Sequence, residues 1–290
     1  MTDPASIVLD GGMGRELQRR NLIQVRTIWS GFALIEHPNT VCDIHSEFIN
    51  AGAAVITTSN YGVVPKFLKI EGLVHRFEEL TRLSVDLARQ ARDNCRRDVK
   101  IAGSLPPLNT SYRPDKVGSR RTLETTYHEL ASILAEGVDI LLCETMSTAA
   151  EAQAAAVETG KPTWVAWSLD DAANGRLRSG ETVTEALAAL QDLTVEAFLF
   201  NCCSTEAISS ALPQLRAATD RRVDAYANVF QPLPKYYEMG AEGETPLRAD
   251  MSAERYAGLA QEWRDIGADI IGGCCGIGPD YIRLLKRTLH

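Results

Sequence analysis

The regular alternation of short apolar runs with longer amphipathic stretches is the feature that most constrains how this chain can fold. Eight runs rich in apolar and β-branched residues are typical of strands, and helical patterns fill the intervals between them. Near-continuous apolar strands that alternate with helices indicate a parallel sheet covered by helices. The predicted strands span residues 6–10, 54–59, 100–104, 138–145, 162–168, 195–202, 222–228 and 268–274.

Eight such units in 290 residues predict an α/β chain folded as a closed (β/α)₈ barrel of the TIM type. An open, doubly wound sheet is the alternative. The chain has no linker, repeat or low-complexity segment, so we expect one domain over residues 1–290. Two long irregular segments, 105–121 and 229–250, are rich in Pro, Gly and charged residues. Loops of this length inside a compact domain are usually functional or mobile.

The charge balance and the ends of the chain exclude several classes of partner. A formal net charge of -8 and a pI near 5.3 leave no basic surface for nucleic acid. The N-terminus lacks the pattern of a signal peptide, and no apolar run approaches the roughly 20 residues that span a bilayer. We therefore expect a cytoplasmic protein with small-molecule partners. The oligomeric state cannot be read from the sequence.

Polar and reactive residue types follow the predicted strands at their carboxyl ends. In a barrel these ends converge on one face, so residues that are far apart in the sequence can meet in one pocket. The residues concerned are Asp10, Thr58 with Tyr61, Glu144, Cys202 with Cys203, Asn228, and Cys274 with Cys275.

Two pairs of adjacent cysteines at strand ends suggest a metal site. Seven cysteines in a reducing cytosol favour a metal or reactive role over a disulfide framework. Three cysteines with one open position match a catalytic zinc site, whereas four would match a closed structural one. Buried packing and redox use remain the alternatives. No histidine follows a predicted strand, which disfavours a hydrolase centre; the five are His37, His45, His75, His128 and His290.

The charge of such a centre indicates its chemistry. Zinc held by three thiolates carries net negative charge, which makes it a poor activator of water but leaves a bound thiolate nucleophilic. The substrate is then expected to be a thiol. A zinc-dependent hydrolase on the same barrel, and a non-catalytic zinc or redox protein that uses all four thiols, stay open at this point.

The stretch "LDGGMGRELQRRN" (9–21) passes from a strand through a glycine turn into a helix. It lacks the third glycine of a dinucleotide-binding fingerprint. Backbone N–H groups at a helix start can instead hold a carboxylate, and Asp10 beside them can hold an ammonium group. Asp10 could instead be a helix cap, and Glu144 a helix cap or a surface charge. Thr58 and Tyr61 are common strand residues, and Trp29 could lie in the core.

Five segments together resemble the homocysteine S-methyltransferase family, in the right order and over nearly the whole chain. This family includes the S-methylmethionine and betaine enzymes and the homocysteine domain of cobalamin-dependent methionine synthase. The segments are "LDGGMGRELQRR", "IWSGFALIEHPNTVCDIHSEFINAGAAVITTSNY", "CETMSTAAEAQAA", "NCCS" and "WRDIGADIIGGCCGIGPDYI".

The resemblance implies a (β/α)₈ barrel with Zn²⁺ bound by Cys202, Cys274 and Cys275 and the sulfur of homocysteine in the open position. It implies that substrate-binding residues surround this ion. Asp10 and Glu144 would hold the amino group, the turn amides around Gly11 and Gly12 the carboxylate, and Thr58, Tyr61 and Trp29 would line the pocket. Cys203 matches no ligand of the family.

Two segments depart from the family pattern on the face that would receive the methyl donor. Residues 103–115 read "GSLPPLNTSYRPD" where the family has a "GPYG"-like stretch, and "YANVFQPLP" replaces "PN" followed by glycine. We expect direct methyl transfer from a small sulfonium or ammonium donor, S-methylmethionine or S-adenosylmethionine, to homocysteine, giving methionine. A betaine or another methylated sulfur compound as donor, and another thiol or a selenol as acceptor, stay open.

Overall fold

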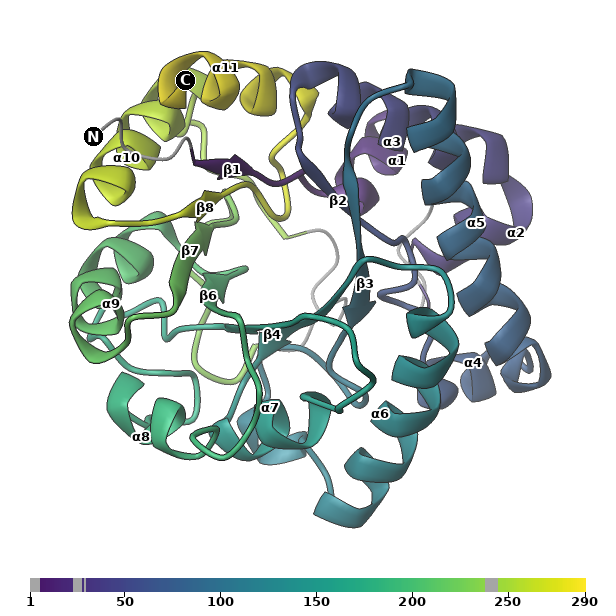
Figure 1. Ribbon diagram of the computed structural model, residues 1–290, viewed down its shortest axis with the longest axis horizontal. Helices are drawn as coiled ribbons and strands as arrows, with labels where there is room; N and C mark the ends of the chain where they lie inside the picture. The colour runs from purple at the N-terminus through teal and green to yellow at the C-terminus, as the bar shows by residue number, and fades with distance from the viewer. Residues whose placement is uncertain (1–5, 23–27, 29, 238–244) are drawn as a thin grey trace.

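Eight parallel strands form a barrel, and the helices surround it in a ring (Figure 1). The structure is a computed structural model that describes residues 6–22, 28, 30–237 and 245–290. All eight predicted strands are confirmed. The strands are β1 (Ile7–Val8), β2 (Val55–Thr57), β3 (Lys100–Leu105), β4 (Ile140–Met146), β5 (Thr163–Trp167), β6 (Ala197–Asn201), β7 (Arg222–Tyr226) and β8 (Ile270–Ile271).

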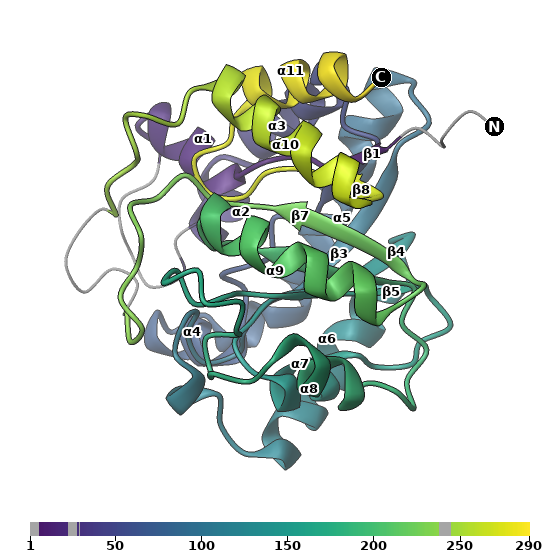
Figure 2. The same ribbon diagram turned by 90° about the vertical axis from the view of Figure 1, so that its left-hand side faces the viewer.

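The helices alternate with the strands as the sequence pattern predicts. Helices α9 and α10 run alongside β7 and β8 on the outside of the barrel (Figure 2). The helices of the described residues are α1 (Met13–Arg19), α2 (Gly31–Glu36), α3 (Pro38–Ala51), α4 (Pro65–Ile70), η1 (Val74–Arg76), α5 (Phe77–Cys95), η2 (Pro114–Lys116), α6 (Arg120–Ala135), α7 (Ala149–Ala155), α8 (Val183–Ala188), α9 (Thr205–Ala218), α10 (Ala253–Ile266) and α11 (Pro279–Leu289).

The sheet closes between its first two strands. The strand order is β1-β8-β7-β6-β5-β4-β3-β2, and all pairs are parallel. Two backbone hydrogen bonds join the remaining edges, from Ala54 N to Val8 O (2.7 Å) and from Asp10 N to Val55 O (3.0 Å). The closed (β/α)₈ barrel is therefore confirmed and the open doubly wound sheet is excluded.

Two apolar layers hold the barrel together. Alternate residues of each strand point inward, where Leu142, Trp164, Leu199 and Tyr226 belong to one buried cluster with their neighbours. The residues between them point outward and pack against the helices in a larger cluster. Both faces of each strand are buried, which explains the near-continuous apolar runs in the sequence. Among the described residues, no helix has both the length and the apolarity needed to cross a bilayer.

Strands β1 and β8 are shorter than the sequence pattern predicts. Each has two residues, and a glycine pair follows each strand, Gly11 with Gly12 after β1 and Gly272 with Gly273 after β8. These two turns lie against each other at the carboxyl end of the barrel, where the N–H of Gly12 donates to the carbonyl of Ile277 (3.0 Å). The short strands thus end where the candidate site begins.

Candidate active site

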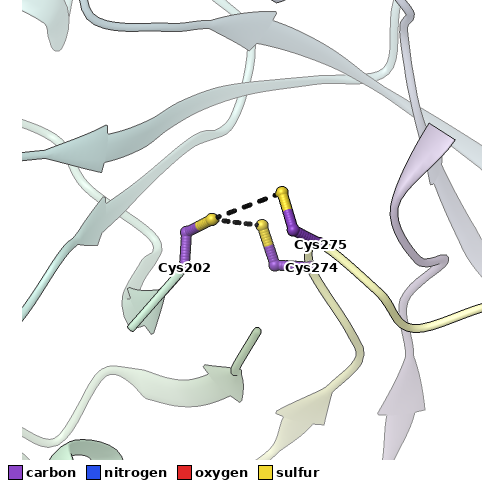
Figure 3. Close-up of side chains that lie close together, drawn as sticks. All are labelled: Cys202, Cys274 and Cys275. Carbon is purple, nitrogen blue, oxygen red and sulfur yellow. Dashed lines mark hydrogen bonds between the residues drawn. The ribbon is translucent and has the colours of Figure 1, made fainter. Parts of the chain in front are cut away.

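Three thiols from the ends of β6 and β8 converge at the mouth of the barrel (Figure 3). The Sγ of Cys202 lies 2.8 Å from that of Cys274 and 3.8 Å from that of Cys275. All three sulfurs lie within 4.8 Å of one another. Strand β7 separates β6 from β8 in the sheet, so the cluster bridges across the end of one strand.

Unusual backbone conformations aim these sulfurs at one point. Cys202 has a φ of 49°, in the left-handed region that few non-glycine residues adopt. Gly276 after the cysteine pair has a φ of 88°, which favours glycine. At Gly273 before the pair, an added Cβ would lie 2.1 Å from the side chain of Ile277. The glycines that flank the "CC" pair are therefore required by the turn and by close packing.

The three sulfurs fit a divalent metal ion that prefers thiolates. A tetrahedral zinc site with bonds of about 2.3 Å has ligand sulfurs roughly 3.8 Å apart. The Cys202–Cys275 pair has this spacing, whereas Cys274 lies 2.8 Å from Cys202 and would move outward to bind the ion. Hydrogen bonds from Cys274 and Cys275 hold the pKa of Cys202 well below its usual range, while the pKa values of Cys274 and Cys275 are raised. The cluster by itself favours one thiolate, and a bound cation would stabilise all three.

Cys203 does not join this cluster. It is fully buried among the outward-facing core residues. Burial raises the pKa of its thiol far above the usual value. Within the described residues, the only group of at least three possible metal-ligating side chains is Cys202 with Cys274 and Cys275. A closed four-thiolate site is therefore not formed here.

The two long irregular segments cover the thiols with apolar side chains. Segment 105–121 contributes Tyr112, and segment 229–250 contributes Phe230, Leu233 and Tyr237. All four side chains are buried and belong to one cluster with Cys202. Such a cover limits the access of water to the sulfurs, and both segments therefore shape the site.

Asp10, directly after β1, is a buried carboxyl group at the wall of the pocket. Its two oxygens accept hydrogen bonds from the backbone N–H (2.7 Å) and the hydroxyl (3.1 Å) of Thr57. Burial raises its pKa to about 7, and the bonds from Thr57 partly offset this shift. The side chain is fixed by β2 and is therefore not a helix cap.

Glu144 is the second buried carboxyl group of the pocket. It lies within β4, beside a register shift between β4 and β5, and the next residue, Thr145, has a φ of 61°. The side chain of Asn201 binds the N–H and the hydroxyl of Thr145 (2.8 and 2.9 Å). Ser104 donates a hydrogen bond to Glu144. Burial raises the pKa of Glu144 to about 8, which the Ser104 bond partly offsets.

The glycines after β1 let two turns approach closely. A Cβ on Gly12 would lie 2.7 Å from the carbonyl oxygen of Cys274, and one on Gly11 would lie 2.2 Å from that of Ile277. The N–H of Gly12 is already bonded to Ile277. Helix α1 begins at Met13, and the residues from Gly11 to Gly14 at its start all line the pocket.

The remaining predicted residues differ in how they contribute. Thr58 and Tyr61 both line the pocket. The Thr58 hydroxyl donates to Asn60 Oδ1 (2.6 Å) and accepts from the N–H of Ser104 (3.0 Å), so it braces neighbouring strand ends. The Tyr61 hydroxyl lies 2.7 Å from that of Ser111. Trp29 lies outside the described residues.

These groups enclose one pocket at the carboxyl ends of the strands. Its cavity of about 100 Å³ is several times the roughly 10–15 Å³ that holds one water, and suits a small organic molecule. No lysine, arginine or histidine is among the described residues that line it. Asp10 and Glu144 line it together with the three thiols.

Sequence reasoning missed Tyr112, Ser104, Asn201 and Tyr226. Tyr226 lines the pocket with a buried hydroxyl that no described group bonds. Asn201 and Tyr226 lie near the ends of predicted strands, so their position was the available signal. Tyr112 lies in an irregular segment, and nothing in the local pattern indicates that it reaches Cys202, 90 residues later.

Comparison with known proteins identifies the family. The family model described as homocysteine S-methyltransferase matches residues 7–289. The chain is 28% identical to homocysteine S-methyltransferase 3 of Arabidopsis thaliana, over 97% of this chain and 89% of that protein. It is 25% identical to selenocysteine Se-methyltransferase of Brassica oleracea var. italica, over 97% of this chain and 88% of the relative.

A solved structure agrees with these matches. The metallated form of the homocysteine methyltransferase MmuM from Escherichia coli superposes with a TM-score of 0.83 at 26% identity, over 98% of this chain and 96% of that one. The family match over nearly the full length, together with this shared fold, shows that the chain belongs to the homocysteine S-methyltransferase family of enzymes.

Proposed function

We propose that this protein is a zinc-dependent thiol methyltransferase that moves a methyl group from a small sulfonium donor to homocysteine, giving methionine. In this proposal residues 1–290 act as one homocysteine-binding domain. The observation that carries it is the pocket itself, which is lined by three converging thiols and two buried carboxyl groups. Family membership supports the reaction class.

The metal would be held by Cys202, Cys274 and Cys275. A zinc ion bound there would supply a fourth position at which a substrate thiol is held as its thiolate. All seven cysteines of the chain are unpaired, in keeping with a reducing compartment, and we propose the cytoplasm. The apolar cover from Phe230, Leu233 and Tyr237 keeps water from competing with the substrate sulfur.

The opposite wall would orient the acceptor amino acid. Asp10 and Glu144 are positioned by Thr57 and Ser104, and their ionised forms would pair with the ammonium group of homocysteine. The turn amides around Gly11 and Gly12, where the chain enters α1, would offer donors to its carboxylate. The amino acid would thus be held at one end while its sulfur reaches the thiol cluster.

The electrostatics of the pocket favour a cationic methyl donor. Its described lining carries carboxyl groups, thiols and the rings of Tyr61, Tyr112 and Tyr226, with no basic side chain. Aromatic faces and acidic groups attract a sulfonium cation. Transfer to a thiolate neutralises two charges, so positioning of donor and acceptor supplies much of the rate and no general base is needed on the donor side. S-methylmethionine and the larger S-adenosylmethionine are the two sulfonium donors that we propose.

Two competing functions fit the site less well. A zinc hydrolase would need a centre that activates water, but none of the five histidines, all of which are described, lines the pocket. A closed structural knot would need a fourth ligand, and Cys203 is buried away from the cluster.

The test combines zinc content with product analysis on reduced protein. We expect one zinc per chain, and methionine by mass spectrometry when homocysteine and S-methylmethionine are supplied together. Cys275→Ser should lose both. Cys203→Ala is the matched control, because it removes an adjacent thiol that lies outside the cluster, and it should keep both.

The outcomes separate the parts of the proposal. Zinc without methionine would redirect the search to S-adenosylmethionine, other donors and selenol acceptors. Absence of zinc from the reduced protein would overturn the metal centre. Loss of zinc in Cys203→Ala would instead support a four-thiolate site.

A further inference from the structure

The hydroxyl of Tyr112 contacts a sulfur of the candidate metal centre. It lies 2.9 Å from the Sγ of Cys202, and the Tyr112 side chain is fully buried. Tyr112 belongs to segment 105–121, and the contact joins this segment to the end of β6. The side-chain amide nitrogen of Asn228 also approaches Cys202 Sγ, but at the longer distance of 4.0 Å.

Both partners of this contact are held in an unfavourable backbone conformation. Tyr112 has a φ of 64° and Cys202 a φ of 49°, and neither residue is glycine. A left-handed conformation in a bulky residue costs free energy and persists only where surrounding contacts determine it. Two such residues that meet through one hydrogen bond therefore point to a functional requirement for that bond.

The ring of Tyr112 is clamped on two sides. The guanidinium carbon of Arg178 lies 4.9 Å from the ring centroid, and the ring of Tyr237 meets it edge to face at 6.2 Å. Arg178 is itself fully buried and is anchored by an ion pair with Asp171 (2.9 Å) and a bond to the carbonyl of Pro234 (3.0 Å).

The same ion pair fixes the turn that carries Cys202. Asp171 accepts hydrogen bonds from the N–H of Ser204 (2.7 Å) and from the N–H of Leu233 (2.8 Å). Thus one buried carboxylate positions the turn after β6, the segment over the thiols and, through Arg178, the ring of Tyr112. Tyr112 and Cys202, which form the O–H···S contact, are therefore both positioned by the Asp171–Arg178 ion pair.

We infer that Tyr112 is a positioning residue of the metal centre, whose hydroxyl donates a hydrogen bond to the Cys202 thiolate and holds it as a ligand. This inference rests on the metal site of the proposed function. A thiolate has no proton to donate, so the phenol must be the donor once Cys202 binds a cation. The bond is then charge-assisted, fixes the direction of the sulfur and stabilises its negative charge.

The test compares two variants that each lose one hydroxyl. Tyr112→Phe keeps the ring and its contacts with Arg178 and Tyr237 but removes the bond to sulfur. Tyr237→Phe is the matched control, because it lies in the same buried cluster and its hydroxyl bonds to Thr245 Oγ1 (2.6 Å). Zinc dissociation constants are measured by competition with a chromophoric chelator. The sulfur-to-metal charge-transfer bands of the cobalt-loaded proteins give a second reading, and urea unfolding of the metal-free proteins a third.

We expect Tyr112→Phe to weaken zinc binding by about 10-fold to 100-fold, as loss of a partner of a metal ligand typically does. Its cobalt charge-transfer bands should shift, while Tyr237→Phe matches the unmodified protein in both readings. Equal zinc affinity and equal spectra for Tyr112→Phe and the unmodified protein would overturn the inference and leave the metal site standing. A weakening that appears in both variants alike, with matching losses in metal-free stability, would assign Tyr112 a packing role only. Absence of zinc from the unmodified protein would remove the metal centre and the inference together.

Discussion

The two carboxyl groups of the pocket, Asp10 and Glu144, are held near the midpoint of their ionisation at neutral pH. Burial raises the pKa of Asp10 to about 7 and that of Glu144 to about 8. A substrate ammonium group pairs only with the ionised forms. Binding of homocysteine should therefore release protons, and its KM should fall as the pH rises through this range.

A variant of Glu144 tests this linkage. Glu144→Gln should raise the KM for homocysteine by roughly 10-fold to 100-fold, since a hydrogen bond to a charged group contributes about 1.5–3 kcal/mol. The KM of this variant for homocysteine should also no longer change with pH near pH 8, because glutamine does not ionise. Steady-state kinetics between pH 6 and pH 9 provide the measurement.

Glu151 offers the matched control for that experiment. It is a buried carboxyl group whose pKa is raised by burial to about 7, but it lies in the first turn of α7, accepts a hydrogen bond from the N–H of Ser147 and does not line the pocket. Glu151→Gln should leave the pH profile of KM unchanged. A KM for homocysteine that is equally insensitive to both substitutions would remove Glu144 from the binding site.

Asp224 is a buried carboxyl group of the barrel interior with no assigned role. It lies in β7, two residues before Tyr226 and on the same inward face, and no described group donates a hydrogen bond of normal geometry to either oxygen. Burial raises its pKa well above the usual value, and the nearby Asp269 adds to the shift. The folded protein therefore binds this proton more tightly than the unfolded chain does.

The sign of the stability effect follows from this difference. The contribution of Asp224 is fully present below its unfolded pKa and is lost as the pH rises towards the folded value, at a limiting slope of about 1.4 kcal/mol per pH unit. Asp224→Asn cannot ionise, so its free energy of unfolding should gain on that of the unmodified protein as the pH rises. Urea unfolding at pH 5, 7 and 9 measures the gap. The free energy of unfolding of the variant minus that of the unmodified protein should increase with pH. A difference that stays constant or decreases would show that Asp224 ionises as readily in the folded protein as in the unfolded chain.

At the scale of secondary-structure elements, the turns after β1 and β8 act as one unit. Gly12→Ala would place a Cβ 2.7 Å from the carbonyl oxygen of Cys274 and 3.1 Å from the Cα of Cys275, and backbone atoms cannot move aside as a flexible side chain can. We expect this single methyl group to displace the thiol pair. Zinc binding should weaken by at least about 10-fold, a loss of roughly 1.4 kcal/mol, and methyl transfer should fall with it.

Gly258→Ala is the control for an added methyl group. Gly258 lies in α10, and a Cβ there meets no atom within 4 Å. Alanine is favoured over glycine in a helix by up to about 1 kcal/mol, so this variant should be slightly more stable and bind zinc normally. If Gly12→Ala bound zinc as well as Gly258→Ala, the close approach of the two turns would have no role in forming the site.

Local sequence patterns predicted the strands and helices. They do not predict which side chains from different strands, helices and loops contact one another. The eight strands follow from apolar runs and their spacing, and Cys202, Cys274 and Cys275 meet because strand ends converge in a barrel. The bond from Tyr112 to Cys202 depends on how an irregular segment folds over the barrel. The bulge that aims Glu144 depends on Asn201, a residue of another strand. Neither of these two contacts produces a periodic pattern in the sequence.

At the scale of the whole molecule, the barrel is closed without help from a metal. Strand β1 pairs with β8 and is bonded to β2, and the ring of His290 at the C-terminus lies 2.8 Å from the carbonyl oxygen of Ser6. The two ends of the described chain are thus held together by protein contacts. The thiol cluster joins β6 to β8 only at the rim of this barrel.

This arrangement predicts what removal of the metal should do. Chelation of zinc under reducing conditions should lower the thermal midpoint by several degrees, because a ligand at 100 times its dissociation constant stabilises the folded state by about 2.7 kcal/mol. The far-UV circular dichroism at room temperature should stay that of an intact α/β barrel. Cys275→Ser should show no dependence of its midpoint on chelator. A structural zinc site behaves differently, since its metal-free chain unfolds. Loss of helical signal on chelation would therefore mean that the three thiols hold the fold together, and their role in catalysis would have to be abandoned.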